Sequence, residues 1–263
     1  MMEELLNIVE EAGEIMKDRT GLGIRTKGTR ENLVTTADLK VEAFLREKLT
    51  ELVEGSSFIG EESEHGQPGK TVWIVDPIDG TSNYARDLKM STVSVALREG
   101  NETVAGVVYQ PYTGEMYRAE AGKGSFLGNE RLSVSSRPLS NSMFCTSWSA
   151  YKKEFAEMCF GVSRRLLPLC EDIRRFGTAA YELCLLAHGR IDIYYEANLQ
   201  PWDHAAGGLI LREAGGFCGS MNGKESFENE GPFIAANSEE NFEILRRTVR
   251  EEMAAFGMSP EYA

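Results

Sequence analysis

A short apolar segment that ends in two aspartates constrains this chain more than any other feature of its sequence. Residues 72–75 (Val-Trp-Ile-Val) are β-branched or aromatic, which predicts a buried strand. Asp76 and Asp79 follow directly, and Pro77 stiffens the turn between them. Two carboxylates about 4 Å apart repel each other by roughly 4 kcal/mol at an effective dielectric constant near 20. Either one of them takes up a proton or a cation lies between them, and a hard cation such as Mg²⁺ suits oxygen ligands.

The residues after the aspartates favour an anion site. Gly80 lets the backbone approach another group closely, and residues 81–83 (Thr-Ser-Asn) are good residues for the start of a helix. The amides of residues 80–82 would then point outward, which is a natural way to bind an anion. A metal beside an anion site indicates phosphate chemistry. For these residues alone, the alternative is a turn in which both aspartates merely cap the backbone.

Periodic patterns on either side of this stretch predict a fold of mixed helices and strands, of class α/β (α+β). Apolar residues recur at helical spacing over residues 3–17, and again from a cap at Thr36 to about residue 53. Residues 72–134 resemble a meander of antiparallel strands joined by turns. Later strands and helices alternate, which predicts a mixed sheet, and residues 239–255 form a last helix.

The polar stretch 133–142 predicts a boundary between two subdomains and not a flexible linker. We therefore expect one domain over residues 1–263. Its subdomains would cover about residues 1–137, with helices, an antiparallel sheet and the main metal site, and 138–263, with the substrate pocket.

Charge and composition exclude several classes of function. Lys and Arg number 28 and Asp and Glu 41, so the net charge is −13. This charge argues against general affinity for nucleic acid or an anionic membrane, whereas an anionic substrate stays possible because a bound metal reverses the local field. The five cysteines form no C-x-x-C pair, and the three histidines are too scattered for a zinc cluster. With an acidic start and no apolar run near the roughly 20 residues that span a bilayer, we expect a cytoplasmic protein.

Other polar residues each have an ordinary structural explanation when taken alone. Asp38 could stabilise a helix dipole, and Glu61 could belong to a solvated acidic turn. Asp203 could cap the helix that follows it, and Lys27 could be a surface charge. Residues 177–179 (Gly-Thr-Ala) could cap a helix or form a floor that admits a ligand.

Taken together, these segments resemble the inositol monophosphatase family of Mg²⁺-dependent, lithium-sensitive phosphatases. The similarity covers about residues 5–250, and the matching segments follow the order and approximate spacing of the family: 33–38 (LVTTAD), 58–62 (FIGEE), 73–84 (WIVDPIDGTSNY), 176–180 (FGTAA), 194–196 (YYE) and 202–203 (WD). The resemblance implies a phosphatase fold of alternating layers, αβαβα. It also implies a homodimer and a small phosphorylated polyol or sugar as the substrate.

The resemblance also implies roles for individual residues. The implied metal ligands, for two or three Mg²⁺ ions per active site, are Glu61, Asp76, Asp79, Asp203 and the backbone carbonyl of Ile78. The implied catalytic residues are Asp38, Glu61 and Thr81. The implied substrate contacts are Ile78, Asp79, Gly80, Thr81, Gly177, Thr178, Ala179, Glu196 and Asp203.

The implied reaction is hydrolysis of a phosphate monoester by a metal-activated water. One metal lowers the pKa of the water, and Thr81, hydrogen-bonded to Asp38, helps to take its proton. A second metal neutralises charge on the leaving alkoxide. The amides of Gly80 and Thr81 hold the phosphate.

The implied substrate is less narrowly defined than the chemistry. Glu196 lies seven residues before Asp203, as in family members that bind inositol hydroxyls, which favours inositol monophosphate. Residues 85–90 lack the expected His-Gly-Phe-Pro pattern and residues 198–201 depart from common versions, so fructose 1,6-bisphosphate and histidinol phosphate stay open. Nucleotide 3′-phosphatases tend to carry Lys after Thr, where this chain has Ser82. A non-catalytic regulatory binding protein of the same fold is the alternative from another class.

Overall fold

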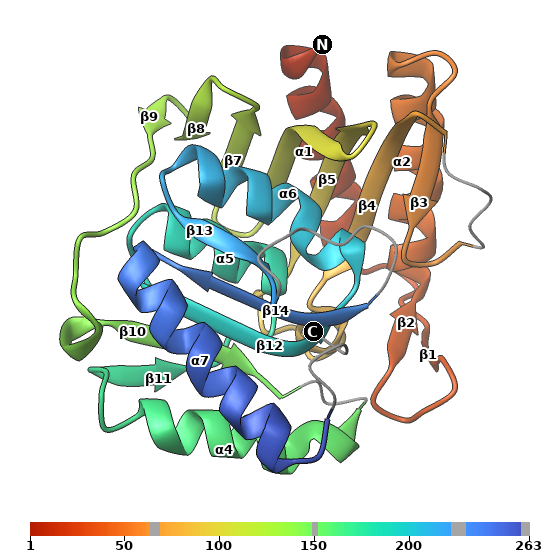
Figure 1. The fold of residues 1–263 in the computed structure, drawn as a ribbon. Coiled ribbons are helices and arrows are strands. Elements are labelled where there is room, and N and C mark those ends of the chain that lie inside the picture. Colours follow the sequence, from red (N-terminus) through yellow and green to blue (C-terminus); the bar gives the residue numbers. More distant parts are fainter. Residues whose placement is uncertain (64–68, 149–151, 222–229, 259–263) are drawn as a thin grey trace.

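The computed structural model describes residues 1–63, 69–148, 152–221 and 230–258, arranged as alternating layers of helices and sheets (Figure 1). The helices are α1 (Met2–Lys17), α2 (Thr36–Leu52), α3 (Thr81–Ala85), α4 (Ala156–Leu166), α5 (Ala179–Ala187), α6 (Pro201–Glu213) and α7 (Glu239–Ala255), with single 3₁₀ turns η1 (Leu139–Asn141) and η2 (Lys153–Phe155). The strands are β1 (Ile24–Thr26), β2 (Leu33–Thr35), β3 (Ser57–Gly60), β4 (Thr71–Asp79), β5 (Thr92–Glu99), β6 (Glu102–Gln110), β7 (Glu115–Glu120), β8 (Gly124–Leu127), β9 (Glu130–Arg131), β10 (Met143–Ser147), β11 (Asp172–Arg174), β12 (Ile193–Leu199), β13 (Phe217–Ser220) and β14 (Gly231–Ala236).

The strands form two large sheets and one small one. The larger sheet has the order β3-β4-β5-β6-β7-β8-β9 and is antiparallel except for the parallel pair β3–β4. The second sheet has the order β11-β10-β12-β14-β13 and is mixed, because β10 runs parallel to β11 and β12 whereas β14 is antiparallel to its neighbours. β1 and β2 form a separate antiparallel pair. The predicted fold class, with a meander first and a mixed sheet later, is confirmed.

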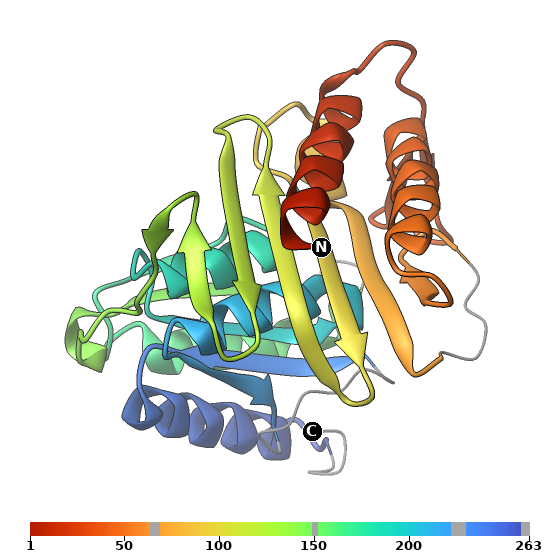
Figure 2. The same ribbon diagram turned by 90° about the horizontal axis from the view of Figure 1, so that it is seen from above.

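The larger sheet is covered by helices on both faces, which explains the continuous apolar run in β4. Successive residues of a strand point to opposite faces. Trp73 and Val75 pack in one core with α1 and α2, whereas Val72 and Ile74 pack in another core with α5 and α6. Figure 2 shows α1 and α2 in red and orange on one face of the sheet, with the later helices on the other.

Helix α2 begins one residue earlier than its sequence pattern predicts. The cap is Thr35 and not Thr36, because the Thr35 hydroxyl accepts hydrogen bonds from the amides of Ala37 and Asp38 at 3.2 and 3.3 Å. In return, Asp38 accepts a hydrogen bond from the Thr35 amide at 2.7 Å. This reciprocal capping box places the Asp38 side chain firmly in the first turn of the helix.

Helices α5 and α6 form the central layer between the two sheets. One apolar core joins them to Ile74 of the larger sheet and to Tyr194 of the second sheet. The approach of α6 to the larger sheet is close at Gly106, where an added Cβ would lie 3.0 Å from the backbone oxygen of Ala206. The absence of a side chain at this position therefore allows the helix to rest on β6.

Helices α4 and α7 complete the outer layer on the far face of the second sheet (Figure 1). Their apolar residues form a third core with the strands, including Phe144, Val162, Ile193, Ile234 and Leu245. Helix α7 is capped by Ser238, whose hydroxyl accepts a hydrogen bond from the Asn241 amide at 3.2 Å. The predicted last helix, residues 239–255, is confirmed.

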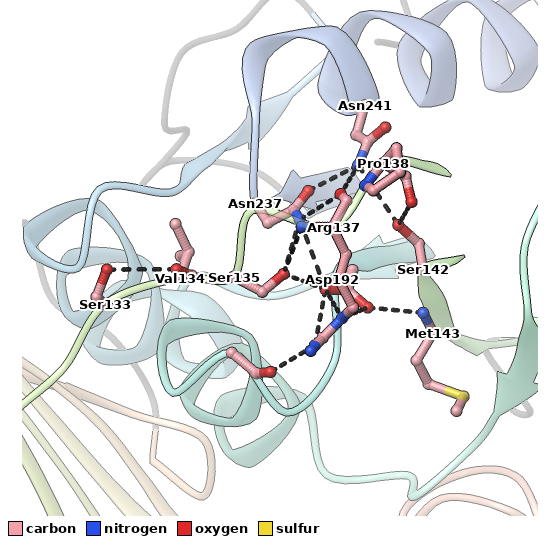
Figure 3. Close-up of polar contacts among 11 residues, drawn as sticks. Ser133, Val134, Ser135, Arg137, Pro138, Ser142, Met143, Asp192, Asn237 and Asn241 are labelled. Atoms are coloured by element: carbon pink, nitrogen blue, oxygen red, sulfur yellow. Dashed lines mark hydrogen bonds and ion pairs between the residues drawn. The ribbon is translucent and has the colours of Figure 1, made fainter. Parts of the chain in front are cut away.

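Buried Asp192 fixes the chain where it passes from the larger sheet to the second one (Figure 3). Its carboxylate accepts hydrogen bonds from Arg137 Nε at 3.0 and 3.1 Å and from the Met143 amide at 2.7 Å. Ser135 and Asn237 join the same network. The polar stretch before β10 is thus held by side-chain hydrogen bonds along its length.

Two short strands, β1 and β13, were not predicted from sequence. β1 and β13 are short strands without an apolar alternation of their own. Cys145, Cys159 and Cys184 are buried and form no disulfide. No helix within the described ranges is long and apolar enough to cross a membrane.

Candidate active site

The two aspartates of β4 lie where its pairing with β5 becomes irregular. Asp76 pairs with Ser94 and Asp79 with Thr92, so the register shifts between them. The Asp76 carboxylate accepts a hydrogen bond from the Ile78 amide at 3.0 Å. Both carboxylates are almost fully buried, with 2% and 6% of their surface exposed, and both line the same cavity. The irregularity therefore brings both acidic groups to one place.

Gly80 forms the sharp turn between β4 and the short helix α3. Its φ of +86° lies in the left-handed region, which favours glycine. An added Cβ would also lie 3.1 Å from the Met90 oxygen and 3.2 Å from the Gly177 oxygen. The Asn83 side chain then donates to the carbonyls of Met90 at 2.9 Å and Phe176 at 2.8 Å. This turn thus joins the first half of the chain to the second.

Asp38 and Thr81 are adjacent, although 43 residues separate them in sequence. The Thr81 hydroxyl lies 3.4 Å from Asp38 Oδ1 and 3.1 Å from the Ile78 carbonyl oxygen, and it can donate its hydrogen bond to either oxygen. The other Asp38 oxygen accepts hydrogen bonds from the amide and hydroxyl of Thr35 at 2.7 and 2.5 Å. Burial raises the pKa of Asp38 to about 6, although these hydrogen bonds oppose the rise. Thr81 lines the cavity and Asp38 lies behind it.

Glu61 follows β3, and its partner is Lys27. The Glu61 amide donates to the Val75 carbonyl at 3.3 Å, which holds the residue beside β4. Lys27 Nζ lies 2.8 Å from a carboxylate oxygen of Glu61 and 2.8 Å from one of Glu62. Burial alone would lower the pKa of Lys27, but the two carboxylates raise it. Lys27 is therefore not a solvated surface charge. It offsets part of the negative charge of Glu61 and Glu62 at the site.

The second half of the chain supplies backbone and carboxylate groups. At the start of α5, the amides of Ala179 and Ala180 donate to the two oxygens of Asp79 at 3.2 and 2.8 Å. At the start of α6, Asp203 accepts a hydrogen bond from the Gln200 amide at 2.7 Å, so it does cap the helix while it also lines the cavity. Burial raises the pKa of Asp203, and the charges of Asp79 and Glu61 raise it further.

Glu196 and the loop before α5 also contribute to the cavity wall. The Glu196 carboxylate accepts a hydrogen bond from the Tyr194 hydroxyl at 2.8 Å, and burial raises its pKa to about 8. Gly177 and Ala179 line the cavity. Thr178 does not line this cavity; it is buried, and its hydroxyl donates to the Met90 carbonyl at 3.2 Å.

The cavity has a volume of about 140 Å³ and is strongly acidic. Carboxylates of six described residues line it, namely Glu31, Glu61, Asp76, Asp79, Glu196 and Asp203. Four further polar residues of the wall, Glu31, Asn32, Ser147 and Arg175, were not predicted as site residues from sequence. They belong to separate loops and strand ends, and no local pattern in the sequence marks them.

The donor set fits a divalent cation that keeps part of its water shell. Burial raises the pKa of Asp76 well above its usual range, and the charges of Glu61, Asp79 and Asp203 add to the rise. Burial likewise raises the pKa of Asp79 to about 7. Among the described residues, no group of three or more acidic, histidine or cysteine side chains is placed so that it could hold a metal ion by itself. Mg²⁺ suits such a site, because it usually binds one or two carboxylates together with waters and substrate phosphate.

Comparisons with known proteins agree with this geometry. The sequence model of the inositol monophosphatase family matches residues 1–254. The chain is 34% identical to "Nus factor SuhB" of Pasteurella multocida over 257 residues, which cover 94% of this chain and 96% of that protein. The structure of the extragenic suppressor protein suhB of Bartonella henselae is similar with a TM-score of 0.87 at 33% identity, covering 95% of this chain and 98% of that one. An IMPase of Thermotoga maritima gives a TM-score of 0.85 at 27% identity, covering 97% and 99%.

Proposed function

The chain belongs to the inositol monophosphatase family, and from this premise we propose that it is a Mg²⁺-dependent phosphomonoesterase that hydrolyses inositol monophosphate to inositol and phosphate. One observation carries the proposal. Acidic side chains from β4, from the end of β3 and from α6 meet in a single cavity beside the backbone of Gly80 and Thr81. Such a cavity repels a phosphate ester unless cations are bound there.

The ligands for two or three Mg²⁺ ions would be Glu61, Asp76, Asp79, Asp203 and the carbonyl of Ile78. Bound Mg²⁺ supplies a water of lowered pKa and offsets charge on the phosphoryl group and the leaving oxygen. The raised pKa values of the buried aspartates support this assignment, because a bound cation would favour their ionised forms.

Thr81 and Asp38 would take the proton from the attacking water. The Thr81 hydroxyl is exposed to the cavity and can pass its own proton to Asp38, which lies 3.4 Å behind it. A carboxylate with a pKa of about 6 is a stronger base than an ordinary aspartate and is still ionised above neutral pH. The amides of Gly80 and Thr81 would orient the phosphate.

The part of the cavity wall formed by Glu196 and the loop before α5 would hold the leaving group. Glu196 can bind hydroxyl groups, while Gly177 and Ala179 leave room for a ring. This combination supports a polyol such as inositol. Fructose 1,6-bisphosphate and histidinol phosphate stay alternative substrates, because residues 85–90 and 198–201 depart from the versions common in the family.

A regulatory binding role is the second candidate, and the names of the relatives favour it. The Pasteurella multocida relative is called a Nus factor, so proteins of this similarity can carry a role other than phosphatase. The presence of every expected ligand carboxylate in one cavity supports turnover in this chain. We further propose the homodimer and the lithium sensitivity that the family resemblance implies.

Phosphate release from a small set of esters tests the proposal. The set contains myo-inositol 1-phosphate, fructose 1,6-bisphosphate, histidinol phosphate and 3′-phosphoadenosine 5′-phosphate, each assayed with Mg²⁺, with EDTA and with added Li⁺. We expect Mg²⁺-dependent release that is greatest for the inositol ester. Mg²⁺-dependent release that is greatest for another ester would support the metal chemistry and would assign the pocket to that ester. Mg²⁺ binding without turnover of any ester would favour the regulatory role.

A further inference from the structure

Buried Glu42 of helix α2 contacts the turn that directly follows Glu61. Only 3% of the surface of Glu42 is exposed. One oxygen of its carboxylate accepts a hydrogen bond from the Glu62 amide at 2.8 Å, and the other oxygen accepts one from the Ser63 hydroxyl. A single side chain, 20 residues earlier in the sequence than Glu62, therefore fixes the two residues that come after Glu61.

Strand pairing stops just before this turn. β3 ends at Gly60, which pairs with Val75, and the Glu61 amide then donates to the Val75 carbonyl at 3.3 Å. The hydrogen bonds to Glu42 begin at the next residue. They therefore continue the support of the chain beyond the point at which the larger sheet provides it.

The surroundings of the Glu42 carboxylate fit its shape and its charge. A Cβ added at Gly60 would overlap this carboxylate and the ring of Phe58, so glycine leaves the space that the carboxylate occupies. The Arg46 guanidinium carbon lies 4.2 Å from the centroid of the Phe58 ring, and an Arg46 nitrogen lies 3.6 Å from the Glu42 carboxylate. Buried charges in proteins are paired in this way. The contacts together hold the carboxylate in one place.

Helix α2 reaches two parts of the active site from one of its faces. Asp38 and Glu42 are four residues apart, so their side chains lie on the same face one turn apart. Asp38 lies 3.4 Å from the Thr81 hydroxyl, whereas Glu42 binds the turn beside Glu61. The position of this helix thus determines both the proposed proton acceptor and the segment that carries a proposed metal ligand.

We propose that Glu42 is a positioning residue for the metal site, which places the Glu61 carboxylate by holding the turn beside it and so sets the affinity for Mg²⁺. The inference rests on the proposed role of Glu61 as a metal ligand. Replacing a residue that supports metal ligands typically changes metal affinity or activity about 10- to 100-fold. Because Glu42 acts on the backbone next to Glu61 and not on its carboxylate, we expect an effect at the lower end of this range.

Two substitutions separate the reach of the Glu42 side chain from its charge. Glu42→Gln removes the charge, yet its oxygen can accept from the Glu62 amide while its NH₂ group donates to the Ser63 oxygen, because a hydroxyl can donate or accept. Glu42→Asp keeps the charge but is one methylene shorter, which withdraws the carboxylate from both donors. Ser63→Ala removes one of the two hydrogen bonds and leaves the charge. Glu47→Asp is the matched control on the same helix, because the Glu47 side chain is 67% exposed.

Calorimetric titration of each full-length variant with Mg²⁺ measures the effect, and thermal unfolding in EDTA shows whether each variant is folded. We expect the Kd for Mg²⁺ to rise about 10-fold in Glu42→Asp and by a smaller factor in Ser63→Ala. Glu42→Gln should stay close to the wild type, and Glu47→Asp should equal it. Phosphate release from myo-inositol 1-phosphate at limiting Mg²⁺ should follow the same order, and excess Mg²⁺ should restore most of the kcat of Glu42→Asp.

The outcomes distinguish this inference from the proposed function. Unchanged Mg²⁺ affinity in folded Glu42→Asp, or a greater loss in Glu42→Gln than in Glu42→Asp or Ser63→Ala, would overturn the inference while leaving the phosphatase function intact. The expected order of Mg²⁺ affinities without release of phosphate by the wild type would support the inference and overturn the proposed activity. A wild type that binds no Mg²⁺ would overturn both.

Discussion

Replacing Asp79 with Asn should affect activity and stability in opposite directions. The carboxylate accepts hydrogen bonds from two amides at the start of α5, yet burial raises its pKa to about 7. Its ionised form is therefore poorly accommodated in the metal-free protein. An asparagine keeps the shape and one acceptor while it removes the charge.

The magnitude follows from the pKa of this carboxyl group. The difference between about 7 in the folded chain and the ordinary 3.8 corresponds to at most about 4 kcal/mol. A raised pKa means that stability is complete at low pH and is lost as pH rises through 7, so Asp79 should cost the metal-free wild type about 2–3 kcal/mol between pH 5 and pH 8. The variant loses one amide hydrogen bond, worth about 1 kcal/mol, at all pH values.

Thermal unfolding in EDTA at pH 5 and pH 8 measures this effect. The metal-free wild type should lose about 5–10 °C in Tm over this range through Asp79 alone, and the Asp79→Asn variant should lose correspondingly less. Mg²⁺ should reverse the order, because it binds and stabilises the wild type more strongly. Phosphate release from myo-inositol 1-phosphate should fall at least about 100-fold in the variant.

The control is Asp18→Asn, which alters an exposed aspartate whose carboxylate accepts only a local hydrogen bond from the Thr20 amide at 3.0 Å. It should leave the pH dependence of Tm and the turnover unchanged. The reasoning fails if Asp79→Asn turns over at nearly the wild-type rate. It fails equally if the Tm of metal-free Asp79→Asn falls with pH as steeply as that of the wild type.

Three further changes test other parts of the structure. Thr81→Ala should lower kcat about 10- to 100-fold with unchanged Mg²⁺ affinity by calorimetry, whereas Thr81→Ser should retain most activity; equal loss in both would contradict the proton path to Asp38. Asp192→Ala should lower the free energy of unfolding by about 3–5 kcal/mol in urea titrations, since it removes the buried carboxylate that pairs with Arg137 and accepts from the Met143 amide; a change below about 1 kcal/mol would show that the network is dispensable. Gly80→Ala should cost about 1–3 kcal/mol and reduce turnover, because φ is +86° there; unchanged stability and turnover would refute the need for glycine.

Much of the fold could be predicted because local patterns and tertiary packing agree. The apolar run at residues 72–75 predicted the strand β4, and α7 was predicted with its observed bounds. The start of α2 was missed by one residue because Thr35 and Thr36 are both good caps, and only the position of Asp38 decides between them. β13 was missed because a Gly- and Ser-containing segment becomes a strand only through its pairing with β14.

The site was predictable only where its residues lie beside a recognisable strand or helix end. Asp76 and Asp79 follow a strand, and Asp203 opens a helix, so their positions had a local signal. Lys27 and Arg175 had none, because their surroundings come from segments distant in sequence. Lys27, for example, meets a carboxylate 34 residues away. Contacts between charged residues far apart in sequence depend on the folded structure, and no periodic pattern in the sequence predicts them.

The central layer of α5 and α6 has a consequence for synthesis of the chain on the ribosome. The larger sheet is complete at Arg131, but α6, which covers one of its faces, ends only at Glu213. Some 80 residues must be translated in between, which takes roughly 4–16 s at about 5–20 residues per second. During that time Val72, Ile74 and the other residues of this face lack α6 as a packing partner. We therefore expect that chaperones must shield this face of the larger sheet until α6 has been translated.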